Sequence, residues 1–213
     1  LDGNRFLSAP VALLPGHNTI TVRAAHPSGA EASHTVTVVY DPEPPRIVSV
    51  EPDGGSLLSD ALVGVNVTAF DDGPLWVNVN GYPCRENDGR FSTIMLFPDG
   101  AHVLITTAGD AAGNTSVCLS NLTVDTSPPN KFTVTAEPIP GSDGTRYVLR
   151  FSATDDVSGV SRYLVSWNGV DYIPAQSPFP LPPLPAGDYL IAVKAVDAAG
   201  WERLSVVELE IKE

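Results

Sequence analysis

Short runs in which apolar and polar residues alternate recur along the whole chain. They include 19–24 (TITVRA), 64–70 (GVNVTAF), 189–195 (YLIAVKA) and 204–211 (LSVVELEI). Alternation with a period of two is typical of a β-strand that buries one face, because successive side chains point to opposite sides. No stretch keeps the period of an amphipathic helix over a useful length. The pattern predicts antiparallel strands joined by the Gly-, Pro- and Asp-rich segments between them.

The same pattern of glycines and aspartates occurs three times. A shift of 84 residues places Gly29 on Gly113 and Asp41 on Asp125, and a further shift of 87 places Gly113 on Gly200. Self-similarity at a fixed period is typical of tandem modules. With roughly seven short strands per repeat, the sequence predicts an all-β protein of tandem immunoglobulin-like (Ig-like) antiparallel β-sandwiches in a linear array.

Double prolines at 44–45 and 128–129 mark the boundaries between repeats. We expect one Ig-like domain at 42–126 and a second at 127–213, whereas 1–41 matches only the C-terminal half of such a domain. A half-sandwich lacks an opposing sheet, and each uncovered large apolar side chain forgoes about 1.5–3 kcal/mol of burial. We therefore expect the missing strands to come from a preceding segment of a longer polypeptide or, by strand donation, from another chain.

Composition and charge narrow the range of partners. The net charge is −13, from 25 acidic and 12 basic residues, which disfavours binding to nucleic acid and to anionic membrane surfaces. No apolar run approaches the roughly 20 residues of a membrane span. The chain begins at Leu1 in the middle of a pattern, without the basic and apolar regions of a signal peptide, as expected at a fragment boundary.

Two segments in the second repeat, AGDAAGNTS (108–116) and VDTSPP (124–129), resemble the bacterial Ig-like repeats of large cell-surface and adhesin proteins. In the third repeat Leu184, Gly187 and Tyr189 are similar to the tyrosine corner of fibronectin type III and Ig-like sandwiches. The resemblance covers nearly the whole chain. It implies an extracellular or cell-surface location and calcium at the joints between domains. Such repeats serve as stalks, adhesion modules and accessory domains of enzymes, so the resemblance indicates fold more than function.

Aspartates that lie far apart in the sequence are expected to meet at these joints, because the ends of two strands and the incoming linker share one end of each sandwich. Converging carboxylates repel one another unless a cation lies between them, and Ca²⁺ takes six to eight oxygen ligands. The alternative is that each aspartate hydrogen-bonds its own turn and needs no ion. The expected sets are Asp41, Asp71, Asp72 and Asp110 at the first joint, and Asp125, Asp155, Asp156 and Asp197 at the second.

The middle repeat holds both cysteines and all three Asn-X-Ser/Thr sequons. Cys84 and Cys118 predict a disulfide, worth roughly 3–4 kcal/mol if unstrained. The alternative is two buried free thiols. Asn66, Asn114 and Asn121 predict glycan attachment if the source organism modifies such sites, and otherwise polar residues on an outer face.

The sequence predicts a non-enzymatic extracellular module, acting as a stalk, spacer or structural subunit of a cell-surface or filamentous assembly. Its partners would be proteins or neighbouring copies. Its histidines lack metal-ligand spacing, and no serine or cysteine has a nucleophile context. The alternative is a carbohydrate- or protein-binding accessory module of a larger secreted protein or enzyme, with Trp201, Tyr172 and Phe179 as the candidate aromatic platform. Trp201 is also predicted to lie at a joint, packed on the preceding domain or exposed to a partner.

Overall fold

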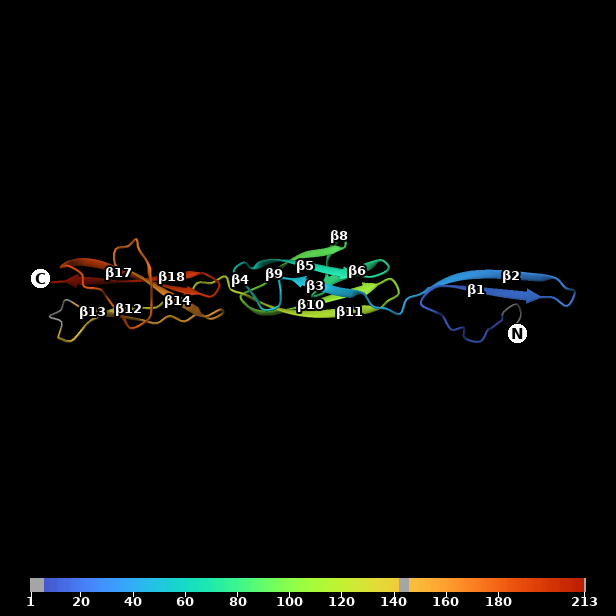
Figure 1. Cartoon of the computed structure of the whole chain (residues 1–213), viewed down its shortest axis with the longest axis horizontal. Coiled ribbons are helices and arrows are strands. Elements are labelled where there is room, and N and C mark those ends of the chain that lie inside the picture. Colours follow the sequence, from blue (N-terminus) through green and yellow to red (C-terminus); the bar gives the residue numbers. More distant parts are fainter. Residues whose placement is uncertain (1–5, 142–145, 213) are drawn as a thin grey trace.

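The computed structural model describes residues 6–141 and 146–212, and every regular element in that part of the chain is a β-strand. The predicted all-β, Ig-like fold is confirmed. Three groups of strands follow one another along the longest axis of the molecule, with the N-terminal hairpin at one end and the C-terminus at the other (Figure 1). Within the described residues no helix is long and apolar enough to cross a membrane.

The first group is a single antiparallel hairpin of β1 (Gly16–Ala25) and β2 (Glu31–Tyr40). Its two faces differ. Ile20 lies opposite Val36 on an apolar face, whereas the hydroxyls of Thr21 and Thr35 lie 3.1 Å apart on a polar one. Val36 is 47% exposed, because no second sheet covers the apolar face within the described residues. The need for covering strands remains a prediction.

The second group is a sandwich of two sheets. One sheet has the order β3 (Arg46–Glu51), β5 (Leu62–Phe70), β9 (Arg90–Leu96) and β8 (Arg85–Asn87). The other sheet has the order β4 (Ser56–Leu58), β11 (Thr115–Val124), β10 (Gly100–Asp110), β6 (Leu75–Val79) and β7 (Tyr82–Pro83). The alternating residues Val65 and Val67 of β5 are buried against Leu104 and Leu122 of the opposing sheet.

The third group repeats this plan. One sheet has the order β12 (Val134–Pro138), β13 (Tyr147–Phe151) and β16 (Phe179–Pro180), and the other β15 (Ile173–Ala175), β14 (Val160–Ser166), β17 (Gly187–Asp197) and β18 (Glu202–Ile211). Leu149, Ile191 and Val193 are fully buried between the sheets. Because the two hydrophobic cores share no residue, each sandwich has a core of its own.

One hydrogen bond recurs at the start of the hairpin in all three groups. The side chains of Asn18, His102 and Tyr189 occupy the same repeat position, and each bonds the carbonyl oxygen four residues earlier, at 2.7, 2.7 and 3.0 Å respectively. A carbonyl can only accept, so His102 must donate from Nε2. Tyr189 thus forms the predicted tyrosine corner, and the other two repeats make the same bond with different side chains.

Proline lies on four of the edge strands. The sheet orders place β7, β12, β15 and β16 at edges. Each of these strands contains one proline, which lacks the N–H needed to pair with a further strand. The prolines are Pro83, Pro138, Pro174 and Pro180.

The predicted disulfide is wrong, since Cys84 and Cys118 are both free. Cys118 is in β11, whereas the backbone of Cys84 bonds to Val77 of β6 on the side away from β10. Three strand spacings therefore separate the cysteines, roughly 14 Å, whereas bridged Cα atoms lie within about 7 Å. Of the alternative, two buried free thiols, the free state holds, but both side chains are only partly buried against the core. Burial raises the pKa of the Cys84 thiol.

The indole ring of Trp76 lies against the backbone of Gly109, its partner across β6 and β10. A Cβ at position 109 would come within 2.3 Å of Trp76 Cζ2, so only glycine fits beneath the ring as placed.

We expect Gly109→Ala to displace this ring and to lower the unfolding free energy of the middle sandwich by about 1 kcal/mol, because the half-exposed ring can swing aside. Urea denaturation followed by tryptophan fluorescence measures the change. Gly64→Ala is the matched control, because a Cβ at that strand position meets nothing within 4 Å. Equal stability of the two variants would contradict the expected steric conflict.

Candidate metal sites at the two joints

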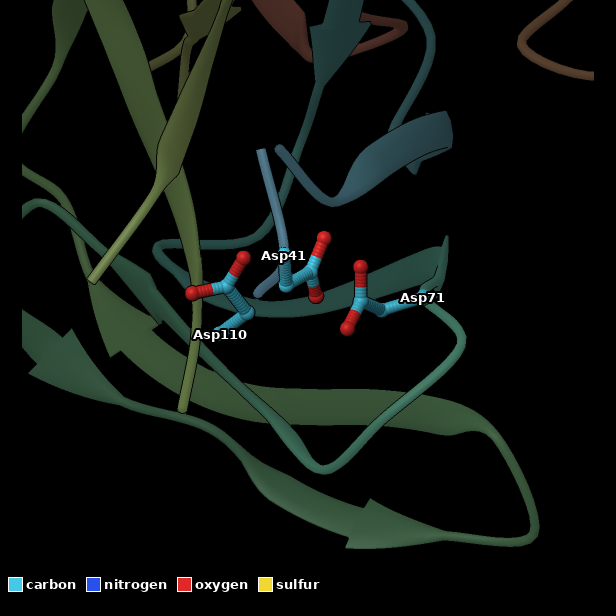
Figure 2. Close-up of side chains that lie close together, drawn as sticks. All are labelled: Asp41, Asp71 and Asp110. Carbon is cyan, nitrogen blue, oxygen red and sulfur yellow. The ribbon is translucent and has the colours of Figure 1, made fainter. Parts of the chain in front are cut away.

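Three carboxylates gather at each joint. Oxygens of Asp41, Asp71 and Asp110 lie within 4.8 Å of one another, and so do those of a second set, Asp125, Asp155 and Asp197. In the first set the linker after β2, the loop after β5 and the end of β10 each supply one aspartate, and Figure 2 shows the three side chains close together. The repeat places the second set in the same way after β11, after β13 and at the end of β17.

Asp72 and Asp156 do not belong to these sets. Both are exposed, and Asp156 Oδ1 accepts a hydrogen bond from Asn130 Nδ2 at 3.0 Å. The structure therefore brings together three of the four aspartates predicted at each joint. The excluded residue is the second of each Asp-Asp pair.

At the first joint, hydrogen bonds within the protein satisfy the most buried carboxylate. Asp110 Oδ1 accepts from the backbone N–H groups of Gly113 and Asn114 at 2.7 and 2.8 Å, and Oδ2 accepts from Asn114 Nδ2 at 2.8 Å. Burial opposes ionisation of Asp110, but the bonds from Asn114 and the loop backbone hold its pKa below the ordinary value. Asp41 accepts a hydrogen bond from the backbone N–H of Glu43, and Asp71 accepts one from that of Gly73, as expected of aspartates in turns.

At the second joint, two buried carboxylate oxygens have no hydrogen-bond partner among residues 6–141 and 146–212. Asp125 is 0% and Asp197 1% exposed, and in both residues the atom concerned is Oδ2. Asp197 Oδ1 accepts from the backbone of Trp201 at 2.9 Å, and Asp155 Oδ1 caps the three backbone N–H groups of 157–159. Burial, together with the charges of Asp125 and Asp155, raises the pKa of Asp197.

The second set has the chemistry of a site for a hard cation. An ionised carboxylate buried without a partner is costly, and adjacent like charges add to that cost. A divalent cation removes both penalties, and Ca²⁺ prefers oxygen ligands of this kind. Asp125, Asp155 and Asp197 therefore fit a calcium ion, and Asp125 and Asp197 each bring an oxygen that no donor in the described part of the chain satisfies.

Both linkers are also held by a side chain from the domain that follows. Asn114 Nδ2 donates to the carbonyl oxygen of Asp41 at 2.9 Å, and Trp201 Nε1 donates to that of Asp125 at 2.9 Å. The sequence alone did not single out these two bonds. The signal was nonetheless present, because the 87-residue shift places Asn114 on Trp201 and Asp41 is matched to Asp125.

Two further residues hold the second linker. The carboxylate of Asp99 accepts from Thr126 N, Thr126 Oγ1 and Ser127 Oγ at 2.8, 2.8 and 2.6 Å, and these bonds lower its pKa. From the other side, Arg203 Nε donates to the carbonyl oxygen of Pro129 at 2.9 Å. Nothing in the sequence distinguishes Asp99 from an ordinary turn aspartate.

The three sequons have different surroundings. Asn66 and Asn121 are exposed on strands β5 and β11, with their side chains on outer faces as alternation predicts. The Asn114 amide, in contrast, is half-buried and bonds to three oxygens at the first joint. A glycan on Asn114 would displace those bonds.

The three residues of the predicted aromatic platform have separate roles. Trp201 bonds the linker and is 40% exposed. The centre of the Tyr172 ring lies 4.5 Å from Lys194 Nζ, and Phe179 packs against the core of the C-terminal sandwich.

Comparison with known proteins gives limited similarity. No protein-family model matches the chain. Bacillopeptidase F of Bacillus subtilis (strain 168) is 28% identical over 155 residues, which is 70% of this chain and 10% of that protein. The chain thus spans about a tenth of the length of this relative.

Solved structures with a related arrangement include a 1.5-MDa bacterial ice-binding adhesin, with a TM-score of 0.46, 18% identity and coverage of 91% of this chain and 73% of that one. An I-band fragment of titin has a TM-score of 0.44 and 14% identity, and the match covers 89% of this chain and 73% of that one. For the fibronectin(III)-like modules of Clostridium thermocellum CbhA the TM-score is 0.42 and the identity 16%, with coverage of 79% of this chain and 94% of that one. At these identities and scores the similarity concerns the fold alone.

The strand orders and the recurring corner define a β-sandwich protein of the Ig-like and fibronectin type III class. The predicted resemblance to this class is confirmed.

Proposed function

We propose that the chain is a non-catalytic, extracellular spacer whose joints keep successive sandwiches in line. The observation that carries this proposal is the bond from each following domain to the carbonyl of the linker aspartate, made by Asn114 at one joint and Trp201 at the other. A short linker held in this way loses much of its hinge freedom. Its partners would be proteins or neighbouring copies in a surface assembly.

Ca²⁺ strengthens the second joint in this proposal. Asp125 belongs to the linker, whereas Asp155 and Asp197 belong to the sandwich that follows. An ion bound by all three would restrain the linker relative to that sandwich. A ligand that binds only the folded state also stabilises it, by about 2.7 kcal/mol when its concentration is 100 times Kd.

Small-angle X-ray scattering and thermal melting of the chain, in CaCl₂ and in EDTA, test the proposal. With Ca²⁺ we expect an extended particle and a higher melting temperature of the third sandwich. Asp155→Asn should reduce the gain in melting temperature. Asp156→Asn, the adjacent control outside the set, should leave it intact.

Two results would count against the proposal. A compact, folded-over particle in both conditions would contradict the spacer role. Melting curves that coincide in CaCl₂ and EDTA at low ionic strength would contradict the calcium site.

A further inference from the structure

The loops that carry Asn114 and Trp201 have the same backbone structure. In each, the aspartate that ends the strand donates its N–H to the carbonyl oxygen four residues later, at 3.1 Å in both loops. Its Oδ1 accepts the N–H of that later residue, at 2.8 Å for Asn114 and 2.9 Å for Trp201. Gly113 and Gly200 precede these residues with φ values of 97° and 96°, in the left-handed region that favours glycine. Positions 114 and 201 are therefore structurally equivalent.

The two side chains differ in how many N–H groups they offer. The Asn114 amide carries two, and it reaches both the Asp41 carbonyl and Asp110 Oδ2. The indole of Trp201 carries one. That single N–H is used on the Asp125 carbonyl, so Asp197 Oδ2 is left without a donor in the part of the chain that the structure describes.

We propose that the residue after the turn glycine decides whether a joint requires a divalent cation. Asn114 closes the first joint with its amide, whereas Trp201 leaves a buried carboxylate oxygen that Ca²⁺ must satisfy. This inference rests on the proposed calcium site and adds a difference between the joints: only the second is cation-dependent. Both joints keep the bond to the linker carbonyl, which either side chain can make.

Exchanging the two residues in the 213-residue chain tests this inference. Isothermal titration with CaCl₂ should show one site in the native chain, at the second joint. Trp201→Asn should weaken that site at least tenfold, because the new amide can bond Asp197 Oδ2. Asn114→Trp should add a second site, because Asp110 Oδ2 loses its partner.

Trp201→Phe is the matched control. It removes the bond to the Asp125 carbonyl but supplies no donor to Asp197, so calcium affinity should change much less than in Trp201→Asn. The tyrosine corner and both cores are untouched, and circular dichroism melting of each variant establishes that it is folded. If a variant does not fold, the native stoichiometry and Trp201→Phe still test the inference.

The outcomes separate the inference from the proposed function. Two sites in the native chain, or native affinity in folded Trp201→Asn, would overturn the inference and leave calcium binding in place. Weaker binding in Trp201→Phe than in Trp201→Asn would also overturn it. Absence of heat and of a calcium-dependent melt in the native chain would overturn the calcium site and the inference together.

Discussion

Replacing Leu104 with alanine is expected to lower the unfolding free energy of the middle sandwich by about 2–5 kcal/mol. Leu104 is fully buried between the two sheets, and large-to-small changes in a core lose burial and leave a cavity. Differential scanning calorimetry should show one transition moved to lower temperature and that of the third sandwich unchanged.

Leu149→Ala is the reciprocal experiment. Leu149 is equally buried in the core of the C-terminal sandwich, which shares no residue with the core of the middle sandwich. It should move the other transition by a similar amount. A single transition that shifts with either substitution would show that the two cores unfold as one unit, contrary to this expectation.

Asn at position 197 is expected to stabilise the third sandwich in EDTA by about 1–3 kcal/mol, the scale of an unsatisfied buried polar group. Burial raises the pKa of Asp197, which means that the folded protein disfavours its charged form. In Asp197→Asn, Oδ1 would still accept the Trp201 N–H, and the amide would bring a donor to a cluster whose other members, Asp125 and Asp155, offer carboxylate oxygens. The same variant should lose its thermal response to Ca²⁺, and melting in EDTA and CaCl₂ measures both effects.

The same substitution at the equivalent position of the first joint should have the opposite effect. Asp110 Oδ2 accepts from the Asn114 amide, so Nδ2 in Asp110→Asn would face another donor. We expect this variant to melt at a lower temperature than the native chain in EDTA. If both variants change stability in the same direction, the two carboxylates do not differ as their hydrogen bonds indicate.

The strands and their buried faces could be predicted because alternation records them directly. Val65 and Val67 are buried and Asn66 is exposed, as the run 64–70 predicted. The pairing of the two cysteines could not be predicted in this way. Alternation predicts which face Cys118 occupies, but it contains no information on how many strands separate it from Cys84.

The joints were predicted in part for a related reason. The repeat located the loops, and the Ig-like strand order indicated that Asp110 would lie near Asp41. Whether a carboxylate is satisfied depends on individual side-chain donors such as those of Asn114 and Trp201. Their hydrogen bonds depend on side-chain geometry, so they became visible only in the structure.

The prolines on the edge strands bear on how copies of this chain could coexist at high density. Unpaired strand edges are templates for fusion between neighbouring sheets. Pro83 in the second sandwich and Pro138, Pro174 and Pro180 in the third interrupt the backbone donors at those edges. At these four edges a neighbouring copy would therefore meet an interrupted row of backbone donors, so that contacts there would be made by side chains.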